Sequence, residues 1–314
     1  MAKNINSLTC WVVTEGMAGT ENQCLGVAEA LGITPDIKRI SLTFPWNKLS
    51  PILGFERAST FSPKFNGPWP DLVLASGRKA ISAARYIKKA SKGKSFVVFI
   101  QDPRVNPKQF DLVAVPHHDK TRGNNVIVTD GAPNRITMPG LVAAKSEFHG
   151  QFSDLKNPRI AVLIGGDSNS YKLTPEATHN LCDQLKLITA SLMITTSRRT
   201  SIECQKIIEN QLGKTYNFIW DHKSKNPYFG MLAWADYIIV TEESTSMISD
   251  AGTTGKPVYI VPLEGGSNKF NRFHNHLKKR GVIKSFDGSI EQWEYEPLHD
   301  AQKIAREIVK KMGL

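Results

Sequence analysis

The sequence predicts an α/β protein made of two consecutive Rossmann-like domains, and three observations support this prediction. The chain has 314 residues, enough for two domains of roughly 150 residues each. Strand-like and helix-like segments alternate through the first half, which is typical of parallel βαβ units. The alternation restarts after residues 133–158, a stretch of weak periodicity that we interpret as a linker. We therefore expect domains at residues 1–140 and 141–314, facing each other across a cleft that holds the ligand.

Short apolar runs rich in β-branched residues predict the strands of the first half. The helix predicted at Glu21–Leu31 has Thr20 or Asn22 as a candidate cap and Gly32 as its end. Two further helices are predicted at Lys79–Ala90 and, in a shorter piece, Trp46–Leu53. The strands are Thr9–Thr14, Ile37–Leu42, Asp71–Ala75, Ser95–Ile100, Leu112–Val115 and Val126–Val128.

The second half repeats the alternation with clearer helix signals. Thr174 before Pro175 is a typical start of a helix. In the last helix, Ala301, Ile304 and Ile308 recur at helical spacing, so we expect it to pack back on the N-terminal half. The predicted strands are Arg159–Ile164, Ser191–Thr196, Thr215–Ile219, Tyr237–Val240 and Val258–Val261. The predicted helices are Pro175–Leu187, Ser201–Leu212, Phe229–Ala233, Ser246–Thr253, Phe270–Lys279 and His299–Lys311.

Hydropathy and cysteine usage predict a cytoplasmic protein. No run of about 18 apolar residues is present, which excludes a membrane-spanning helix. The first strand follows Met1 so closely that we expect no signal peptide. The four cysteines lack metal-ligand spacing and are interpreted as reduced, mostly buried thiols. The protein is expected free in the cytoplasm or peripheral on the inner membrane.

The net charge of +11 calls for an anionic partner, such as a phosphorylated small molecule or an anionic lipid surface. Residues 78–94 carry seven basic side chains and no acidic one, either as a solvated helix face or as a patch for a membrane or polyanion. Residues 44–57 mix aromatic, aliphatic and basic side chains. They either cover the core or dock on an anionic bilayer that carries a lipid-linked acceptor. Nucleic acid is not expected as a partner.

The strongest local pattern runs from Asp236 to Pro262 and predicts a strand, a hydroxyl-rich turn, a helix and another strand. The first turn of this helix offers backbone N–H groups and hydroxyls to an anion. Asp250, one turn further on, could accept hydrogen bonds from a vicinal diol such as a ribose. In the alternative interpretation the serines only cap the helix and Asp250 complements its dipole. The candidate phosphate-binding residues are Ser244, Thr245, Ser246 and Met247.

A second candidate phosphate site lies where a strand passes into a helix. Arg198 and Arg199 could bind a pyrophosphate, because guanidinium groups bind oxyanions in a bidentate way, or they could be ordinary surface arginines. Gly166, after the strand Arg159–Ile164, could bring backbone close to the same phosphates. The neighbouring candidates are Thr196, Ser197 and Thr200.

The pattern of acids predicts no metal ion and no cofactor. The sequence contains no Asp-x-Asp motif, so we expect Arg198, Arg199 and helix dipoles to stabilise the leaving diphosphate in place of a metal. The loop from Thr14 to Gly19 is not a GxGxxG sequence, which disfavours a dinucleotide. A nucleotide sugar is expected as a substrate.

Inverting sugar transfer needs one base to take the proton of the acceptor hydroxyl. His118 is our first candidate, Glu15 our second and Asp102 our third, because each follows a predicted strand of the first half. Each of them could equally be structural. Asp102 in particular precedes Pro103 and could only initiate a turn.

The block Asn226–Pro262 resembles the donor-binding region of the glycosyltransferase that makes lipid II and that of the Kdo transferases of lipopolysaccharide assembly. Those enzymes carry an acid five residues before a Gly and seven before a Pro, a spacing kept by Asp250, Gly255 and Pro257. The resemblance implies ribose binding by Asp250, phosphate binding by residues 244–247, and base contacts by Asn226 and Tyr228. This chain has Asp where those enzymes have Glu.

A second resemblance covers nearly the whole chain. The segments 16–26, 110–119, 197–200, 226–227 and 246–247 together resemble the mitochondrial-fission-protein-like family, named from the plant elongated-mitochondria factor. This resemblance implies a glycosyltransferase-B (GT-B) type fold. Its plant member is regarded as a membrane-surface recruiter of a dynamin-type GTPase, whereas its bacterial members look like glycosyltransferases. The N-terminal half is then expected to bind the acceptor, at Gly19, Asn22, Gln23, Ser76 and Arg78.

These observations favour a metal-independent glycosyltransferase that uses a nucleotide sugar on a cell-envelope acceptor, either lipopolysaccharide or lipid-linked. Two alternatives remain at this stage. One is a non-catalytic membrane-surface adaptor built on the same fold. The other is a sugar-nucleotide epimerase, which needs carboxylates and a histidine at its site.

Overall fold

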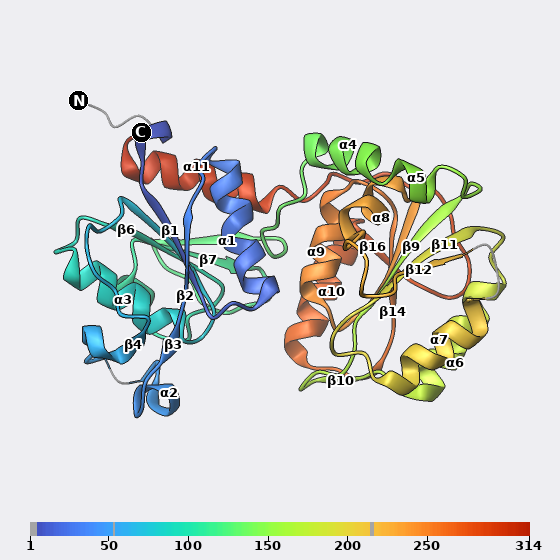
Figure 1. Ribbon diagram of the computed structural model, residues 1–314, viewed down its shortest axis with the longest axis horizontal. Helices are drawn as coiled ribbons and strands as arrows, with labels where there is room; N and C mark the ends of the chain where they lie inside the picture. The colour runs from blue at the N-terminus through green and yellow to red at the C-terminus, as the bar shows by residue number, and fades with distance from the viewer. Residues whose placement is uncertain (1–4, 53, 214–216) are drawn as a thin grey trace. The chain divides into compact units, whose positions relative to one another are not determined.

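The computed structural model describes residues 5–52, 54–213 and 217–314, which form two α/β units (Figure 1). The first unit comprises Met1–Arg135 together with His299–Leu314, and the second comprises Ile136–Leu298. The division thus falls between Arg135 and Ile136, whereas the predicted boundary followed residue 140. Each unit is built on one six-stranded sheet in which all neighbouring strands are parallel. The predicted pair of Rossmann-like domains is therefore confirmed.

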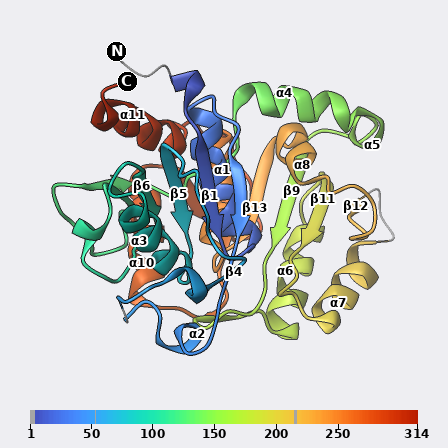
Figure 2. The ribbon, with the colours of Figure 1, turned by 60° about the vertical axis from the view of Figure 1, so that its left-hand side comes forward.

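The first sheet has the strand order β2-β1-β5-β6-β7-β8 (Figure 2). Its central strands are continuous apolar runs because helices cover both faces. On one face pack α1 (Ala18–Ala30) and α11 (Asp300–Met312), and on the other packs α3 (Ala80–Ala90). The strands are β1 (Cys10–Thr14), β2 (Asp36–Arg39), β5 (Leu72–Ser76), β6 (Phe96–Ile100), β7 (Leu112–Pro116) and β8 (Val126–Thr129).

The final helix α11 packs on the first unit, as its apolar spacing predicts. Ile304 and Ile308 are fully buried in the same cluster as Val27 of α1 and Leu74 of β5. At its first residue, the Asp300 carboxylate accepts hydrogen bonds from the N–H groups of residues 130 and 131, at 2.9 and 2.8 Å. Apolar burial and these two hydrogen bonds together hold the end of the chain on the first sheet.

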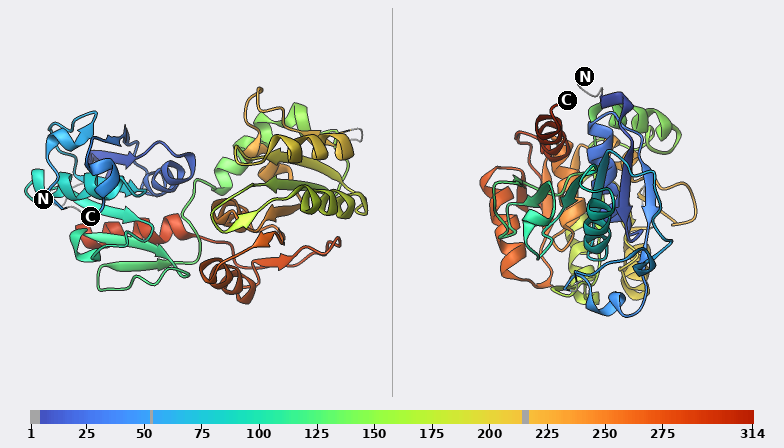
Figure 3. Two further views of the ribbon diagram at one scale, coloured as in Figure 1. Left: turned by 90° about the horizontal axis from the view of Figure 1, so that it is seen from below. Right: turned by 90° about the vertical axis from the view of Figure 1, so that its left-hand side faces the viewer.

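The second sheet has the order β12-β11-β9-β13-β14-β16, with helices on both faces (Figure 3). One face is covered by α8 (Tyr228–Trp234), α9 (Thr245–Thr253) and α10 (Asn268–Lys279), and the other by α6 (Pro175–Lys186) and α7 (Ile202–Leu212). The strands are β9 (Arg159–Ile164), β11 (Ser191–Thr196), β12 (Phe218–Ile219), β13 (Tyr237–Thr241), β14 (Val258–Val261) and β16 (Ile283–Ser285).

Smaller elements decorate the two units. Two antiparallel ribbons are present, β3 (Ser41–Leu42) with β4 (Phe61–Ser62), and β10 (Tyr171–Lys172) with β15 (Glu264–Gly265). The remaining elements are α2 (Trp46–Leu49) and the 3-10 turns η1 (Ile5–Ser7), η2 (Ala58–Thr60) and η3 (Pro107–Gln109).

The division between the two units falls inside residues 133–158, the stretch interpreted as a linker, but much of this stretch is helical. This stretch forms α4 (Met138–Glu147), capped by the Thr137 hydroxyl, and α5 (His149–Phe152). Apolar residues lie all around α4, so its sequence shows no one-sided periodicity.

Two other element predictions need correction, and two more include residues that the structure does not describe. Helix α1 begins at Ala18, three residues early, and neither Thr20 nor Asn22 caps it. The strand predicted at 37–42 is divided between β2 and β3. Residue 53 of the predicted helix 46–53 and residues 215–216 of the strand 215–219 lie outside the described residues.

Each sheet has one point where its strand order reverses, between β1 and β5 in the first and between β9 and β13 in the second. The chain leaves two neighbouring strands in opposite directions there, which opens a crevice beyond their carboxyl ends. Ligands of open parallel sheets bind at such points. The loops after these four strands are therefore where a functional site is expected.

Two observations concern the cellular setting. Across residues 5–52, 54–213 and 217–314, no helix combines the length and apolar character needed to cross a bilayer. All four cysteines are buried and unpaired, as predicted.

Candidate functional site

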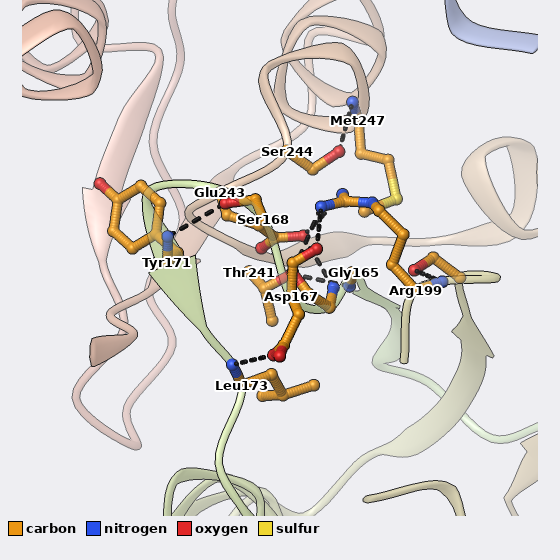
Figure 4. A network of polar contacts seen from close by, with 12 residues as sticks. Gly165, Asp167, Ser168, Tyr171, Leu173, Arg199, Thr241, Glu243, Ser244 and Met247 are labelled. Carbon is orange, nitrogen blue, oxygen red and sulfur yellow. Dashed lines mark hydrogen bonds and ion pairs between the residues drawn. The ribbon is translucent and has the colours of Figure 1, made fainter. Parts of the chain in front are cut away.

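Three loops meet beyond the carboxyl ends of β9, β11 and β13 in the second unit (Figure 4). They are residues 165–168 after β9, residues 197–201 after β11, and residues 242–244 after β13. Because β9 is paired in register with both β11 and β13, the ends of the three strands lie side by side. The loops include the strand-order reversal, so this edge of the sheet is the candidate site.

Glu243 is the centre of this site. Its side chain has no exposed surface, and its Oε1 atom accepts hydrogen bonds from the Gly166 N–H at 2.9 Å and from Arg199 Nη2 at 3.1 Å. Its Oε2 atom is buried without a hydrogen-bond partner among the described residues. Burial raises the pKa of this carboxyl, against the opposing effects of the Gly166 N–H and the Arg199 charge.

Gly165 and Gly166 make the close packing around Glu243 possible. A Cβ atom on Gly165 would lie 1.5 Å from Glu243 Oε1, and one on Gly166 would lie 2.2 Å from the carbonyl oxygen of Arg199. Neither position therefore admits a side chain without displacement of its neighbour. The backbone of Gly166 packs closely against the loop after β11, and its predicted approach to phosphates stays a prediction.

The two arginines of the loop after β11 have different surroundings. Arg199 donates from Nη1 to the carbonyl oxygens of Asp167 at 3.0 Å and Gly166 at 3.3 Å, in addition to its ion pair with Glu243. Its guanidinium is thus held by the protein. Arg198 is exposed and forms no hydrogen bond or ion pair with any residue that the structure describes. Arg198 is therefore the arginine available to an external anion.

Hydroxyl groups shape the same loop. The Thr200 hydroxyl accepts from the Ser197 N–H at 3.0 Å, and the Ser197 hydroxyl accepts from the Arg199 N–H at 3.1 Å. The Thr196 hydroxyl lies 2.8 Å from His222 Nε2. These predicted site residues are placed together, with Ser197 and Thr200 supporting the backbone of the loop.

The amino end of α9 keeps part of its hydrogen-bonding capacity. The Ser244 hydroxyl caps the helix by accepting from the Met247 N–H at 3.4 Å, as the alternative interpretation of the serines anticipated. The first N–H groups of a helix have no partner within the helix, so those of Thr245 and Ser246 remain for an external acceptor. Both residues are half-buried at this edge.

Asp250 and Tyr228 are brought together from α9 and α8. The Tyr228 hydroxyl donates to Asp250 Oδ2 at 2.9 Å, and Asn226 Oδ1 accepts from the Tyr228 N–H at 3.0 Å where α8 begins. Burial raises the pKa of Asp250 to about 7. No described residue donates a hydrogen bond to the second oxygen, Oδ1. The carboxyl therefore retains an acceptor for a ligand hydroxyl.

In the first unit, Glu15 and the loop after β5 meet at the other strand-order reversal. Glu15 Oε1 accepts from the Lys79 N–H at 2.7 Å, and Oε2 lies 3.3 Å from Lys79 Nζ. Both oxygens of this candidate base are thus engaged by donors. Ser76 is fully buried, and its hydroxyl has no hydrogen-bond partner among the described residues. Arg78 donates to the carbonyl oxygen of Ser50, at 3.1 and 3.2 Å.

Three further candidates of the first unit, Gly19, Asn22 and Gln23, lie on α1. Gln23 of α1 accepts at Oε1 from Gln101 Nε2 at 3.0 Å, and Gln101 has a strained φ of 97° directly after β6. Gly19 and Asn22 are exposed on the same helix.

The two other candidate bases follow β6 and β7. His118 is buried, with Nε2 3.7 Å from Asp119 Oδ2. Asp102 accepts from the N–H of residue 104 at 2.9 Å and from the hydroxyl of residue 121 at 2.8 Å, so it shapes a turn.

Glu242 and Glu243 belong to this edge of the sheet but have no predicted role. Two consecutive acids after a buried strand were an available signal, since one of them must point toward each face of the sheet. The hydroxyl groups of the same turn drew the interpretation toward phosphate binding alone.

Comparison with known proteins identifies the family. Residues 18–312 match the family described as Mitochondrial fission ELM1. The chain belongs to this family. The Arabidopsis thaliana protein named Mitochondrial fission protein ELM1 is 29% identical, over 96% of this chain and 90% of its own length. The Rickettsia prowazekii protein RP120 is 27% identical, over 96% of this chain and 98% of its own.

Solved structures establish the fold of this ELM1-family chain as GT-B type. The spinosyn forosaminyltransferase SpnP matches with a TM-score of 0.53 at 12% identity, over 98% of this chain and 91% of its own. The UDP-GlcNAc 2-epimerase of Neisseria meningitidis, bound to UDP-GlcNAc, matches with a TM-score of 0.52 at 14% identity, over 96% of this chain and 100% of its own. At these identities the likeness concerns the fold alone.

Proposed function

We propose that this ELM1-family protein is a metal-independent glycosyltransferase that binds a nucleotide sugar in its second unit. The observation that carries the proposal is the arrangement on α9. Helix N–H groups at Thr245 and Ser246 remain for phosphate oxygens, and Asp250, in the second turn of the same helix, has an acceptor oxygen for the ribose diol. Tyr228, whose hydroxyl donates a hydrogen bond to the same carboxyl, then lies near the base of the nucleotide.

The leaving diphosphate is stabilised by positive charge already built into this edge. Arg198 is exposed for direct contact, while Arg199 keeps its position through Glu243 and the carbonyl oxygens after β9. Arginine stays charged at all physiological pH values, and a fixed array of donors needs no reorganisation during the reaction. His118 is our first candidate for the base, followed by Glu15 and Asp102, and each of the three follows a strand of the first unit.

We further propose a cell-envelope acceptor presented at the inner membrane surface. Phe44, Ile52 and Phe55 are 76, 85 and 80% exposed in the first unit. Lys48 and Arg57 are exposed in the same segment. The acid of this segment, at position 56, is largely buried in an ion pair with Arg85, so the exposed charges are positive. Exposed apolar groups flanked by positive charge suit an anionic bilayer.

The proposed donor site is tested by thermal unfolding with a panel of nucleotide sugars. At a hundredfold excess over Kd, a ligand that binds only the folded state stabilises it by about 2.7 kcal/mol, so one member of the panel raises Tm. Asp250→Ala abolishes this shift, whereas Asp183→Ala, which removes an exposed aspartate of α6, retains it. No shift with any nucleotide sugar would contradict the proposal.

A second candidate function is a non-catalytic membrane-surface adaptor, favoured by the exposed Phe44, Ile52 and Phe55 and by the name of the Arabidopsis relative. It predicts sedimentation with anionic vesicles that Phe44→Ser and Phe55→Ser reduce, and no affinity for any nucleotide sugar. Vesicle binding together with nucleotide-sugar binding would favour the transferase.

A further inference from the structure

The second unit contains a pocket of about 400 Å³ beside the donor site described above, with which it shares Glu242. It lies between α10 and the carboxyl ends of β14 and β16. Polar side chains form most of its wall: Glu242, Asn271, His274, Asn275, Lys278 and Ser285. Ile260 and Pro262 supply its apolar side.

The turn after β13 connects this pocket to the Glu243 network. Glu243 points to the loops after β9 and β11, whereas its neighbour Glu242 lines the pocket. The Leu263 N–H donates to Glu242 Oε1 at 2.7 Å, which fixes the carboxylate. The second oxygen, Oε2, lies 3.7 Å from His274 Nδ1. A ligand in the pocket would therefore contact Glu242, the residue that precedes Glu243 in sequence.

The geometry determines the protonation of His274. Its Nε2 lies 2.9 Å from the carbonyl oxygen of Glu242, which can only accept, so Nε2 carries the proton. Burial lowers the pKa of His274 to about 4, so the ring is neutral at physiological pH. His274 Nδ1 therefore carries a lone pair and can accept a hydrogen bond. This atom lies on the side of Glu242 Oε2.

Exposed polar side chains of α10 form part of the lining of the pocket. Asn271, Asn275 and Lys278 follow one another at helical spacing, and all three are exposed. The Lys278 ammonium donates to the Ser285 hydroxyl at 2.9 Å, which directs it across the end of β16. The pocket thus offers acceptors at Glu242 and His274, a donor at Lys278, and both kinds of group at the amides of Asn271 and Asn275.

We propose that this pocket binds the sugar ring of a substrate through its hydroxyl groups. Each sugar hydroxyl donates and accepts, so the hydroxyls of one ring can donate to Glu242 and His274 and accept from Asn275 and Lys278. Ile260 and Pro262 can contact the C–H surface of the ring. A free anion is disfavoured by the Glu242 carboxylate, and a free cation by Lys278. The proposal rests on the proposed function, in which a sugar is the transferred group.

Saturation-transfer NMR on the full chain tests this assignment. The probes are glucose, galactose, mannose and N-acetylglucosamine, each at millimolar concentration. We expect transfer to at least one sugar in the wild type, and a loss of at least threefold in Asn275→Ala and in Lys278→Ala. Lys279→Ala is the matched control, because it removes an exposed lysine from the same helix outside the pocket. No transfer to any of the four sugars, or equal transfer in all variants, would overturn the proposal.

Titration with UDP and UDP-GlcNAc separates this proposal from the function on which it rests. The pocket variants should bind UDP like the wild type and UDP-GlcNAc at least tenfold more weakly than the wild type. Unchanged UDP-GlcNAc affinity in both variants, with the Asp250→Ala effect intact, would refute the sugar pocket and leave the transferase standing. Sugar binding to the pocket without affinity for any nucleotide sugar would refute the donor site alone.

Discussion

At the residue scale, two glycines set how closely the loops of the second unit approach one another. Neither Gly165 nor Gly166 has a left-handed backbone conformation, so the conformational freedom of glycine does not explain why glycine occupies these positions. Glycine is needed because the Glu243 carboxylate lies against Gly165 and the Arg199 peptide group lies against Gly166. A lone Gly-Gly pair gives little information in a sequence, and its partners become visible only in the fold.

Gly165→Ala is expected to destabilise the protein by roughly 3 kcal/mol, because its Cβ would overlap a carboxylate oxygen that is itself buried. Denaturant unfolding measures the change. Gly150→Ala is the control, since a Cβ there meets nothing within 4 Å. Equal stability of the two variants would show that Glu243 is not packed on Gly165.

Asp250 makes stability depend on pH. Its folded pKa of about 7 lies above its ordinary value of 3.8, so the folded state binds more protons between these pH values. Wild-type stability should therefore fall as pH rises through this window. Asp250→Asn keeps an acceptor for Tyr228 and removes the charge, so its advantage over the wild type should grow by on the order of 2 kcal/mol from pH 4 to pH 8. Parallel pH profiles of the two proteins would contradict the assignment.

At the element scale, the ion pair between Arg199 and Glu243 joins the loop after β11 to the turn after β13. Arg199→Met should cost about 2 kcal/mol, because it leaves a buried carboxylate without its counter-charge. Glu243→Gln should recover most of this loss in the double variant, since the amide oxygen can still accept from the Gly166 N–H. Denaturant unfolding of the four proteins measures the coupling. Additive effects would show that the two side chains act independently.

The strands and most helices could be predicted because each is a local pattern. The strands Arg159–Ile164 and Val258–Val261 are apolar runs whose predicted and observed bounds agree. Helix α4 was missed because its apolar residues surround the helix and give no stripe. The split of β2 from β3 depends on pairing with residues 61–62, which no local pattern contains.

The candidate site was only partly predictable for the same reason. Arg198 and Arg199 are neighbours in sequence, and nothing local indicates that one is held by Glu243 while the other is exposed. The pairing of Asp250 with Tyr228 likewise joins residues of two helices. The contact between His274 of α10 and the Glu242 carbonyl joins residues 32 apart in sequence, so no local pattern indicates it. The roles of these residues in binding stay predictions.

At the scale of the whole molecule, the chain ends by returning to its first unit. Ile304 and Ile308 of α11 are fully buried there, and the Asp300 carboxylate accepts two backbone N–H groups. Residues 299–314 are therefore part of the core of the first unit, although they follow the second in sequence.

Ile304→Ala should destabilise the first unit by about 3 kcal/mol, because it opens a cavity in the core shared by α11, α1 and β5. Hydrogen exchange should show faster exchange in α1, β1 and β5. Ile202→Ala is the control, since this isoleucine of α7 is 71% exposed. Unchanged protection of the first sheet in Ile304→Ala would contradict the placement of α11.

The central claim is that a nucleotide sugar binds at the edge formed by the loops after β9, β11 and β13. Hydrogen exchange with and without the nucleotide sugar that raises Tm locates the ligand most directly. We expect the ligand to slow hydrogen exchange in residues 197–201 and 242–250 of the wild type, and to cause no such slowing in Asp250→Ala. Protection confined to other segments, or none with any nucleotide sugar, would contradict it.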